Sequence, residues 1–163
     1  MNKNIFNKTL EVLKFQKLKV VDKDTDRPWG GFFVISEDNA QEFSNIYFKG
    51  LNIEELKVSG KLSPKILIIA PKKRLSWQYH HRRSEIWKVV NGKIKVVTSH
   101  DDVERKEKIL KEGDEISLYK GERHRIIGLE DYAVVAEIWI HINKDNPSDE
   151  NDIVRLQDDF DRN

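Results

Sequence analysis

The segment from Gln78 to Trp87 reads QYHHRRSEIW and brings an amide, imidazoles and a carboxylate close together in the chain. Gln78 and His80 are two positions apart, so both side chains leave the same face of an extended strand. Glu85 follows shortly afterwards, and His124 comes much later, after a glycine-bounded segment. Imidazole and carboxylate are ordinary ligands of zinc, iron, manganese and nickel. These four residues are therefore candidate ligands of a divalent cation acting as a Lewis acid on a carbonyl or hydroxyl group.

The residue types alone leave a second interpretation open. Histidines are often exposed, or hydrogen-bonded within a core, so two histidines and one glutamate fit metal and structural roles about equally. His100 lies in a charged loop and His141 on the last expected strand, and we interpret both as structural. An expected strand at residues 74–80 favours a metal or a polar ligand, because its inward face carries polar side chains that need partners when buried: Ser76, Gln78 and His80.

The surrounding pattern predicts an all-β sandwich or barrel that would position these groups. Apolar and β-branched runs predict strands at residues 65–70, 74–80, 86–90, 93–98, 115–119 and 133–142. Turn residues at 91–92 and 121 and a charged stretch at 99–113 separate them. Residues 22–31 are interpreted as a polar segment ending in a turn, and the acidic tail after residue 142 as a surface wrap anchored by Ile153, Val154, Leu156 and Phe160.

Helical spacing of apolar residues predicts an amphipathic helix at 5–18, packed on the barrel or on a second subunit. A second helical region at 39–56 is interrupted at Gly50 and Leu51, and Asn52 is the expected N-cap of its last part. We define residues 1–26 as an N-terminal helical extension and residues 27–163 as the main domain, with a helical insertion near 38–63.

Composition excludes several classes of function. The chain has 163 residues and a formal net charge of +1, with no single-sign field of the kind that nucleic acid requires. It has no cysteine, which excludes a disulfide framework or a thiolate zinc site. No apolar run has membrane-spanning length and the N-terminus has no secretory pattern, so we expect a cytoplasmic protein without membrane or nucleic-acid partners.

The spacing of the candidate ligands resembles the first motif of the cupin superfamily. That motif runs Gly, five residues, His-x-His, three or four residues, Glu, six residues and Gly. The corresponding positions here are Lys72, Gln78, His80, Glu85 and Gly92.

The second cupin motif runs Gly, five residues, Pro-x-Gly, two residues and His. The corresponding positions are Gly113, Tyr119, Gly121 and His124. The resemblance implies an all-β fold, the cupin double-stranded β-helix or jelly-roll barrel, preceded by short N-terminal helical segments. It also implies that Gln78, His80, Glu85 and His124 are the metal ligands.

The sequence more closely resembles the cupin domain of type II phosphomannose isomerases, usually the C-terminal part of a bifunctional isomerase and mannose-1-phosphate guanylyltransferase. Four ordered motifs between residues 27 and 162 carry the resemblance: RPWG at 27–30, LSWQYHHRRSEIW at 75–87, GERHR at 121–125, and NDIVR with DDFDR at 151–162. In this family Gln replaces the first cupin histidine, which matches Gln78. No glycine-rich nucleotide loop precedes the cupin segment.

This resemblance implies a metal-dependent aldose–ketose isomerase of a sugar phosphate, with mannose 6-phosphate and fructose 6-phosphate as first candidates and zinc as the first candidate metal. His81 is the candidate base, and Arg83 is the candidate for stabilising an enediolate. Arg82, Arg83 and Arg125 are candidate substrate ligands, because guanidinium suits phosphate. Cupins are commonly dimers, so a homodimer using the N-terminal helix is expected.

Two departures keep other functions open. The family has histidines where this chain has Arg82 and Ile86. One alternative is a non-catalytic metal-binding cupin that binds a sugar or a nucleotide sugar. Another is an isomerase of a different phosphosugar, such as a heptose phosphate. The insertion near 38–63 is expected to reshape either the cavity mouth or a dimer contact.

Overall fold

The computed structural model describes residues 2–58 and 60–162. Its helical elements are α1 (Asn4–Phe15), η1 (Glu37–Asn39), α2 (Ala40–Tyr47) and α3 (Ile53–Leu56). Its strands are β1 (Val20–Arg27), β2 (Gly30–Ile35), β3 (Lys65–Ile69), β4 (Trp77–Tyr79), β5 (Arg83–Asn91), β6 (Lys93–Ser99), β7 (Lys106–Lys111), β8 (Glu115–Leu118), β9 (Arg123–Gly128), β10 (Ala133–His141) and β11 (Val154–Gln157).

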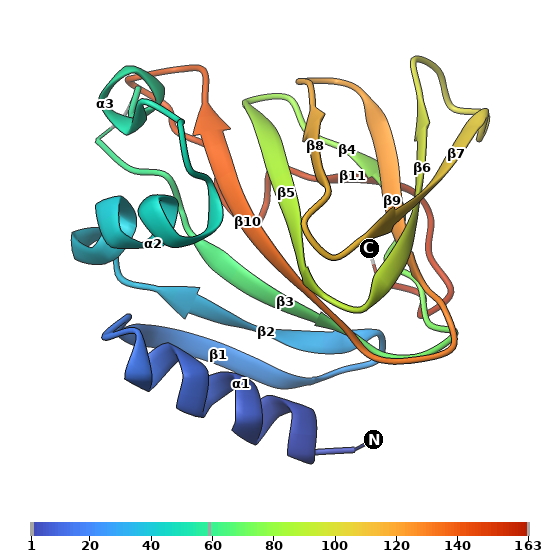
Figure 1. The fold of residues 1–163 in the computed structure, drawn as a ribbon. Helices are drawn as coiled ribbons and strands as arrows, with labels where there is room; N and C mark the ends of the chain where they lie inside the picture. Colours follow the sequence, from blue (N-terminus) through green and yellow to red (C-terminus); the bar gives the residue numbers. More distant parts are fainter. Residues whose placement is uncertain (1, 59, 163) are drawn as a thin grey trace.

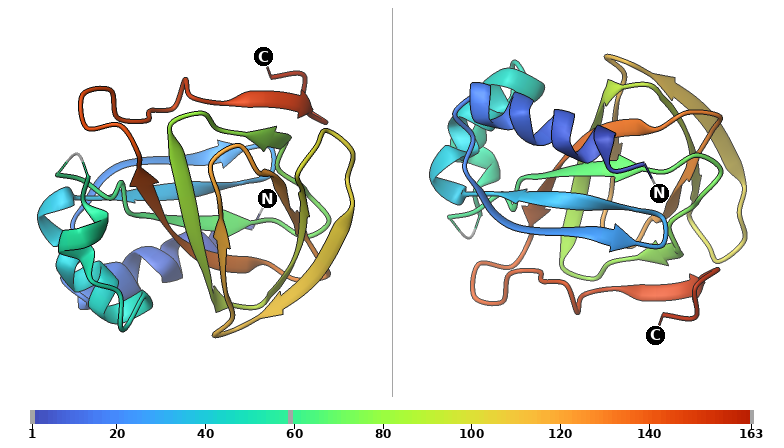
Figure 2. Two further views of the ribbon diagram at one scale, coloured as in Figure 1. Left: turned by 90° about the horizontal axis from the view of Figure 1, so that it is seen from above. Right: turned by 90° about the horizontal axis from the view of Figure 1, so that it is seen from below.

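The strands form two sheets that face each other as a barrel (Figure 1). One has the order β1-β2-β3-β10-β5-β8 and the other β11-β4-β9-β6-β7, with antiparallel neighbours in both. The helices cover the outside of the first sheet, while β11 runs along another side of the barrel (Figure 2). The predicted all-β cupin fold with a short N-terminal helix is confirmed.

The six-stranded sheet is buried on both faces, which explains the unbroken apolar sequence of β3. Alternate residues of β3 belong to different cores: Ile66 and Ile68 pack against the helices, while Leu67 and Ile69 pack inside the barrel. The same alternation on β10 turns Ile138 outward to the helices. Glu137 and Trp139 lie on the opposite, inward face of β10, where they line a cavity inside the barrel that is described below.

The helices complete the outer core. Phe6 and Leu13 of α1 are buried against the barrel, which is one of the two packings predicted for this helix. Phe43 and Tyr47 of α2 join the same core, and Asn52 caps α3 by accepting the backbone N–H of Glu54 at 3.2 Å, as expected. None of the described residues between 38 and 63 lines the cavity detailed below.

Several strands were missed by the sequence pattern. The segment 22–31, predicted as a polar segment ending in a turn, contains a turn at Pro28 and Trp29, but β1 and β2 on either side of it form a hairpin that was not predicted. The charged stretch 99–113 contains β7, and β9 and β11 were also not predicted. The strands β1 and β7 lie at sheet edges, where polar side chains face solvent and the alternation weakens. The strand expected at 74–80 is shorter, spanning Trp77–Tyr79.

The backbone at Lys72 explains one departure from the cupin motif. Lys72 has φ +58°, the left-handed conformation that glycine adopts most easily, at the position where the motif has glycine. Gly92, at the end of the same motif, has φ +77°. The fold has kept the turn geometry although the residue changed. Within the described residues, no helix is both long enough and apolar enough to cross a membrane.

Candidate metal centre

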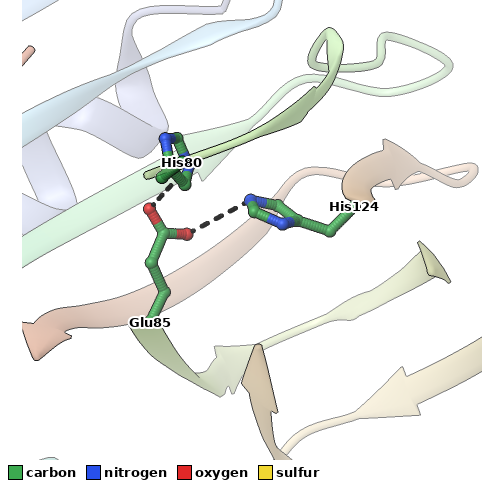
Figure 3. Close-up of side chains that lie close together, drawn as sticks. All are labelled: His80, Glu85 and His124. Carbon is green, nitrogen blue, oxygen red and sulfur yellow. Dashed lines mark ion pairs between the residues drawn. The ribbon is translucent and has the colours of Figure 1, made fainter. Parts of the chain in front are cut away.

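Three of the four predicted metal ligands meet inside the barrel (Figure 3). His80 directly follows β4, Glu85 lies on β5 and His124 lies on β9, so the barrel closure brings together residues far apart in the chain. Their nearest ligand atoms all lie within 4.8 Å of one another. Each residue is at most 2% exposed, which makes this a buried cluster of two imidazoles and one carboxylate.

Backbone carbonyls fix the orientation of both imidazole rings. Nδ1 of His80 lies 2.7 Å from the carbonyl oxygen of Asp152, and Nδ1 of His124 lies 2.8 Å from that of Glu122. A carbonyl only accepts, so each Nδ1 carries a proton, and Nε2 presents a lone pair whenever the ring is neutral. Hydrogen bonds of this kind orient the histidines of metal sites.

The lone pairs of the two rings face the carboxylate of Glu85. Nε2 of His80 lies 3.2 Å from Oε1, and Nε2 of His124 lies 3.5 Å from Oε2. Among the described residues, Glu85 Oε2 and His124 Nε2 have no hydrogen-bond partner although both are buried. Arg83 lies within hydrogen-bonding distance of His80 Nε2, at 3.3 Å, and donates to Glu85 Oε1 at 2.9 Å, so the acceptors that lack a donor are Glu85 Oε2 and His124 Nε2. A divalent metal between these two atoms would satisfy both. The residues present therefore fit a metal.

The charge states suit metal binding. Burial lowers the pKa of His124 to about 4, so this ring is neutral at physiological pH. Burial acts to raise the pKa of Glu85, but the charges of His80 and Arg83 outweigh it and hold that pKa well below its usual range. The cluster therefore combines an ionised carboxylate with at least one neutral imidazole.

Gln78, the fourth predicted ligand, lies beside this cluster. It is paired across the sheet with His124, and residues paired in this way point to the same face. Its amide oxygen accepts the hydroxyl of Ser76 at 2.6 Å, and both residues line the cavity in front of the metal cluster. The amide oxygen retains a second lone pair for a metal or a ligand.

Arg83 connects the metal cluster to the tail. Its Nε donates to Glu85 Oε1 at 2.9 Å, and Nη1 donates to Ser148 Oγ at 2.8 Å. The guanidinium also lies 3.6 Å from the ring centre of Trp139, close enough for a cation–π contact. Arg83 is 5% exposed and lines the cavity, so its positive charge is held beside the candidate metal centre.

A cavity of about 320 Å³, at the lower end of the usual size of small-molecule sites, is lined by Glu85 of the cluster and by Gln78, whereas His80 and His124 do not line it. Glu137 lines this cavity and was not predicted from the sequence. Its two carboxyl oxygens accept the indole N–H groups of Trp87 and Trp139, at 2.8 and 2.9 Å. Burial, assisted by the charge of Glu85, raises the pKa of Glu137 to about 7. A carboxyl group of this kind can release or accept a proton near neutral pH.

The structure separates the other predicted substrate residues from the cavity. His81 is exposed and its ring makes an edge contact with Tyr79. Arg82 lies near Asp149 and Asp152. Of His81, Arg82 and Arg125, none lines the cavity. Their catalytic and substrate roles stay predictions for which this geometry offers no support.

The guanidinium of Arg125 is engaged elsewhere. It donates to the carbonyl of Leu75 at 3.0 Å and to Glu104 at 2.7 Å, and it also bonds to the side chain of Gln157. These contacts tie β9 to the loop before β7 and to the tail.

The two histidines interpreted as structural also lie outside the cluster. His100 is exposed, while His141 is fully buried, accepts the N–H of Ser148 and bonds to Ser63.

The tail supports the metal cluster, which the sequence pattern did not reveal. The carboxylate of Asp152 accepts the backbone N–H groups of His81 and Arg82, at 2.9 and 3.0 Å, and the hydroxyl of Ser148. Its carbonyl holds the ring of His80. A buried aspartate in the NDIVR motif, 3% exposed, thus fixes the turn that carries a candidate metal ligand.

The fold and the buried histidine–glutamate cluster define a cupin barrel with a candidate metal centre. A family model described as "Mannose-6-phosphate isomerase C-terminal" matches residues 36–158, most of the chain. The chain belongs to this family. No curated protein matches its sequence.

Solved structures with the same fold are distant in sequence. The capsular polysaccharide assembling protein CapF from Staphylococcus aureus matches with 17% identity and a TM-score of 0.54, over 86% of this chain and 34% of that one. CapF with the inhibitor 3-isopropenyl-tropolone matches with 19% identity and a TM-score of 0.56, over 86% and 34%. Vicilin from Solanum lycopersicum (tomato) matches with 17% identity and a TM-score of 0.56, over 85% and 35%. The chain spans about a third of the length of each, and these likenesses concern the fold alone.

Proposed function

We propose that this protein is a metal-dependent aldose–ketose isomerase of a sugar phosphate, with mannose 6-phosphate and fructose 6-phosphate as its first candidate substrates. The observation that carries the proposal is a buried cluster whose unpartnered Glu85 and His124 atoms converge beside a cavity that also holds Glu137. Family membership supports the choice of reaction.

The proposed reaction needs a metal site and a positive charge beside it, and different residues provide them. Gln78, His80, Glu85 and His124 would hold a divalent metal, with zinc as the first candidate, and the bound ion would polarise the substrate carbonyl. Arg83 holds a fixed positive charge beside this cluster, where it would stabilise the negative charge that develops on the substrate oxygens.

Glu137 is the proton carrier in this proposal. Isomerisation removes a proton from the carbon next to the carbonyl and returns it to the carbonyl carbon. Glu137 lines the cavity and is held rigidly by two indole N–H groups, whereas the ring of His81 is exposed and outside the cavity. We therefore assign the base to Glu137, and a His81→Ala variant should keep most of the activity.

The two departures from the family pattern do not reach the cavity. Ile86 packs in the outer core beneath the helices, on the face of β5 opposite to Glu85 and Trp87. Arg82 lies near the tail carboxylates of Asp149 and Asp152. These positions therefore give little reason to favour a non-catalytic cupin over an isomerase.

Interconversion of mannose 6-phosphate and fructose 6-phosphate by the purified chain tests the proposal, with added zinc and after chelation. In D₂O, proton transfer through Glu137 should introduce solvent deuterium at the carbon that is reprotonated. Glu137→Gln should reduce kcat by about a hundredfold or more, in the range of general acid–base contributions. Glu115→Gln, at an exposed site on β8, is the control. Binding of metal and sugar without turnover of any phosphosugar would overturn the isomerase and favour a binding module.

A further inference from the structure

Arg155, from the NDIVR motif of the tail, points to the inside of the barrel. It is paired with Gln78 across β11 and β4, and Gln78 is paired with His124 across β4 and β9. Residues paired in this way share one face of a sheet, with about 4.8 Å between adjacent strands. Arg155 therefore belongs to the same inward row as two candidate metal ligands, two strands away from His124, and it lines the cavity.

Arg155 has no acceptor in the described part of the chain. No hydrogen bond or ion pair between described residues reaches its guanidinium, and its Nε is buried without a partner. Other cations of the cavity wall do have ion-pair partners: Arg162 pairs with Asp158 at 2.7 Å, Lys65 with Glu150, and Arg27 with Asp24 at 2.9 Å, although the Nε of Arg27 also makes no hydrogen bond among the described residues. Arg155 as a whole is only partly buried, so its other N–H donors can reach the solvent of the cavity, where a bound acceptor would replace water.

Positive charge gathers around this unpaired group. Burial lowers the pKa of Arg155, and the charges of Arg162 and Arg27 lower it further, while Asp158 and Glu150 act in the opposite direction. All three arginines line the same cavity. Arg27 and Arg162 are each paired with an aspartate, and Asp22 and Glu150 line the same cavity, so the positive charge without a partner on this side is that of Arg155, which an anionic ligand would compensate.

We propose that Arg155, flanked by Arg27 and Arg162, forms a subsite for a phosphoryl group. Arginine binds phosphate through parallel N–H donors, and two further arginines, although each is paired with an aspartate, line the same wall. The subsite deepens the proposed isomerase function, on which it rests for the identity of the sugar. The row of paired residues then explains how a phosphosugar is oriented, with its carbonyl at the metal cluster and its phosphoryl group at the tail.

Binding of inorganic phosphate tests the subsite without any turnover. Titration calorimetry on chelated and on zinc-loaded protein should show one phosphate site, weakened about ten- to hundredfold in Arg155→Gln, as expected when a charged hydrogen bond is lost. Arg155→Lys should keep part of the affinity. Arg105→Gln, which changes an exposed arginine paired with Asp101, should leave it unchanged. Equal affinity in wild type and Arg155→Gln would overturn the subsite.

The melting temperature shows whether the variants are folded. Arg155 has no hydrogen-bond or ion-pair partner among the described residues, so Arg155→Gln should melt close to wild type without phosphate. It should also lose the rise in melting temperature that phosphate gives to the wild type. Competition distinguishes the two sources of a phosphoryl group: displacement by mannose 6-phosphate indicates a monoester, and displacement by a nucleoside diphosphate sugar indicates a diphosphate.

Kinetics separates failure of the subsite from failure of the isomerase. If the enzyme turns over mannose 6-phosphate, Arg155→Gln should raise KM about ten- to hundredfold and change kcat little, since the phosphoryl group does not react. An unchanged KM would overturn the subsite and leave the isomerase standing. Phosphate binding that depends on Arg155, without turnover of any phosphosugar, would support the subsite and overturn the isomerase.

Discussion

Replacing His124 by Ala should abolish the stabilisation of the fold by a divalent metal. His124 Nε2 and Glu85 Oε2 face each other at 3.5 Å without a donor, so the apo cluster holds two buried acceptors that a bound cation would satisfy. A metal that binds the folded but not the unfolded chain adds RT ln(1 + [M]/Kd) to the free energy of unfolding. His124→Ala removes one of the two imidazole ligands, the one that β9 contributes to the site.

The expected magnitude follows from that relation. With free zinc at a hundred times Kd, the wild type gains about 2.7 kcal/mol. For a chain of this size each kcal/mol shifts the melting temperature by about 2–4 °C, so zinc should raise it by about 5–11 °C. His124→Ala also removes a fully buried ring that contacts His80 and Trp87, and its chelated baseline should fall. The quantity to compare is therefore the zinc-induced rise above each variant's own chelated baseline.

The assay is a thermal melt of each protein after chelation and after titration with zinc, with bound metal measured in parallel. His100→Ala is the matched control, because His100 is exposed and distant in sequence from the cluster, and it should keep the full rise. Gln78→Ala is a milder variant that should lose part of the rise. An equal rise in His124→Ala and wild type would refute the metal centre, as would a wild type that gains nothing from any divalent metal.

Other predictions concern the cavity carboxyl, the tail and the Lys72 turn. In chelated protein Glu137 should contribute a fall of about 3 kcal/mol to the free energy of unfolding between pH 4.5 and 7, because the folded state keeps its proton at a pKa of about 7. His124 and His141, whose pKa values burial lowers to about 4, contribute in the opposite direction, so the Glu137 part is measured as the difference between the pH profiles of wild type and Glu137→Gln in urea titrations. Asp152→Asn should weaken zinc affinity about ten- to hundredfold by calorimetry, unlike exposed Asp131→Asn, because it loosens the turn carrying His80. Lys72→Gly should raise the free energy of unfolding by up to about 1 kcal/mol in denaturant melts, since φ is +58° there.

The strand pattern predicted a sandwich or barrel, and the resemblance to the two cupin motifs predicted the candidate metal ligands, including the distant His124. The apolar run of β3 and the two-residue spacing of Gln78 and His80 follow directly from strand geometry. The edge strands β1 and β7 were missed because their exposed faces carry charged residues, which removes the apolar alternation. The pattern therefore predicted the buried strands better than the strands exposed at an edge.

Glu137 could not be found from spacing to the other site residues. It lies in the apolar run AVVAEIWIH, where a single acidic residue within a buried strand is the only signal. Its partners, Trp87 on the neighbouring strand and Trp139 on its own, become visible as donors once the register of β5 and β10 is known. A carboxyl group inside an otherwise apolar strand is costly to bury, and this cost indicates that Glu137 has a function.

The tail contributes to both ends of the proposed substrate site, although its motif gave no sign of this in the sequence. Asp152 holds the turn of His80 beside the metal cluster, and Arg155, three residues later, lines the cavity beside Gln78. The pairing of β11 with β4 fixes both residues relative to the ligand-bearing strand. Loosening that pairing would therefore weaken metal binding and phosphate binding together. A substitution at Arg155 itself should affect phosphate alone, because its guanidinium makes no contact with the cluster's supports.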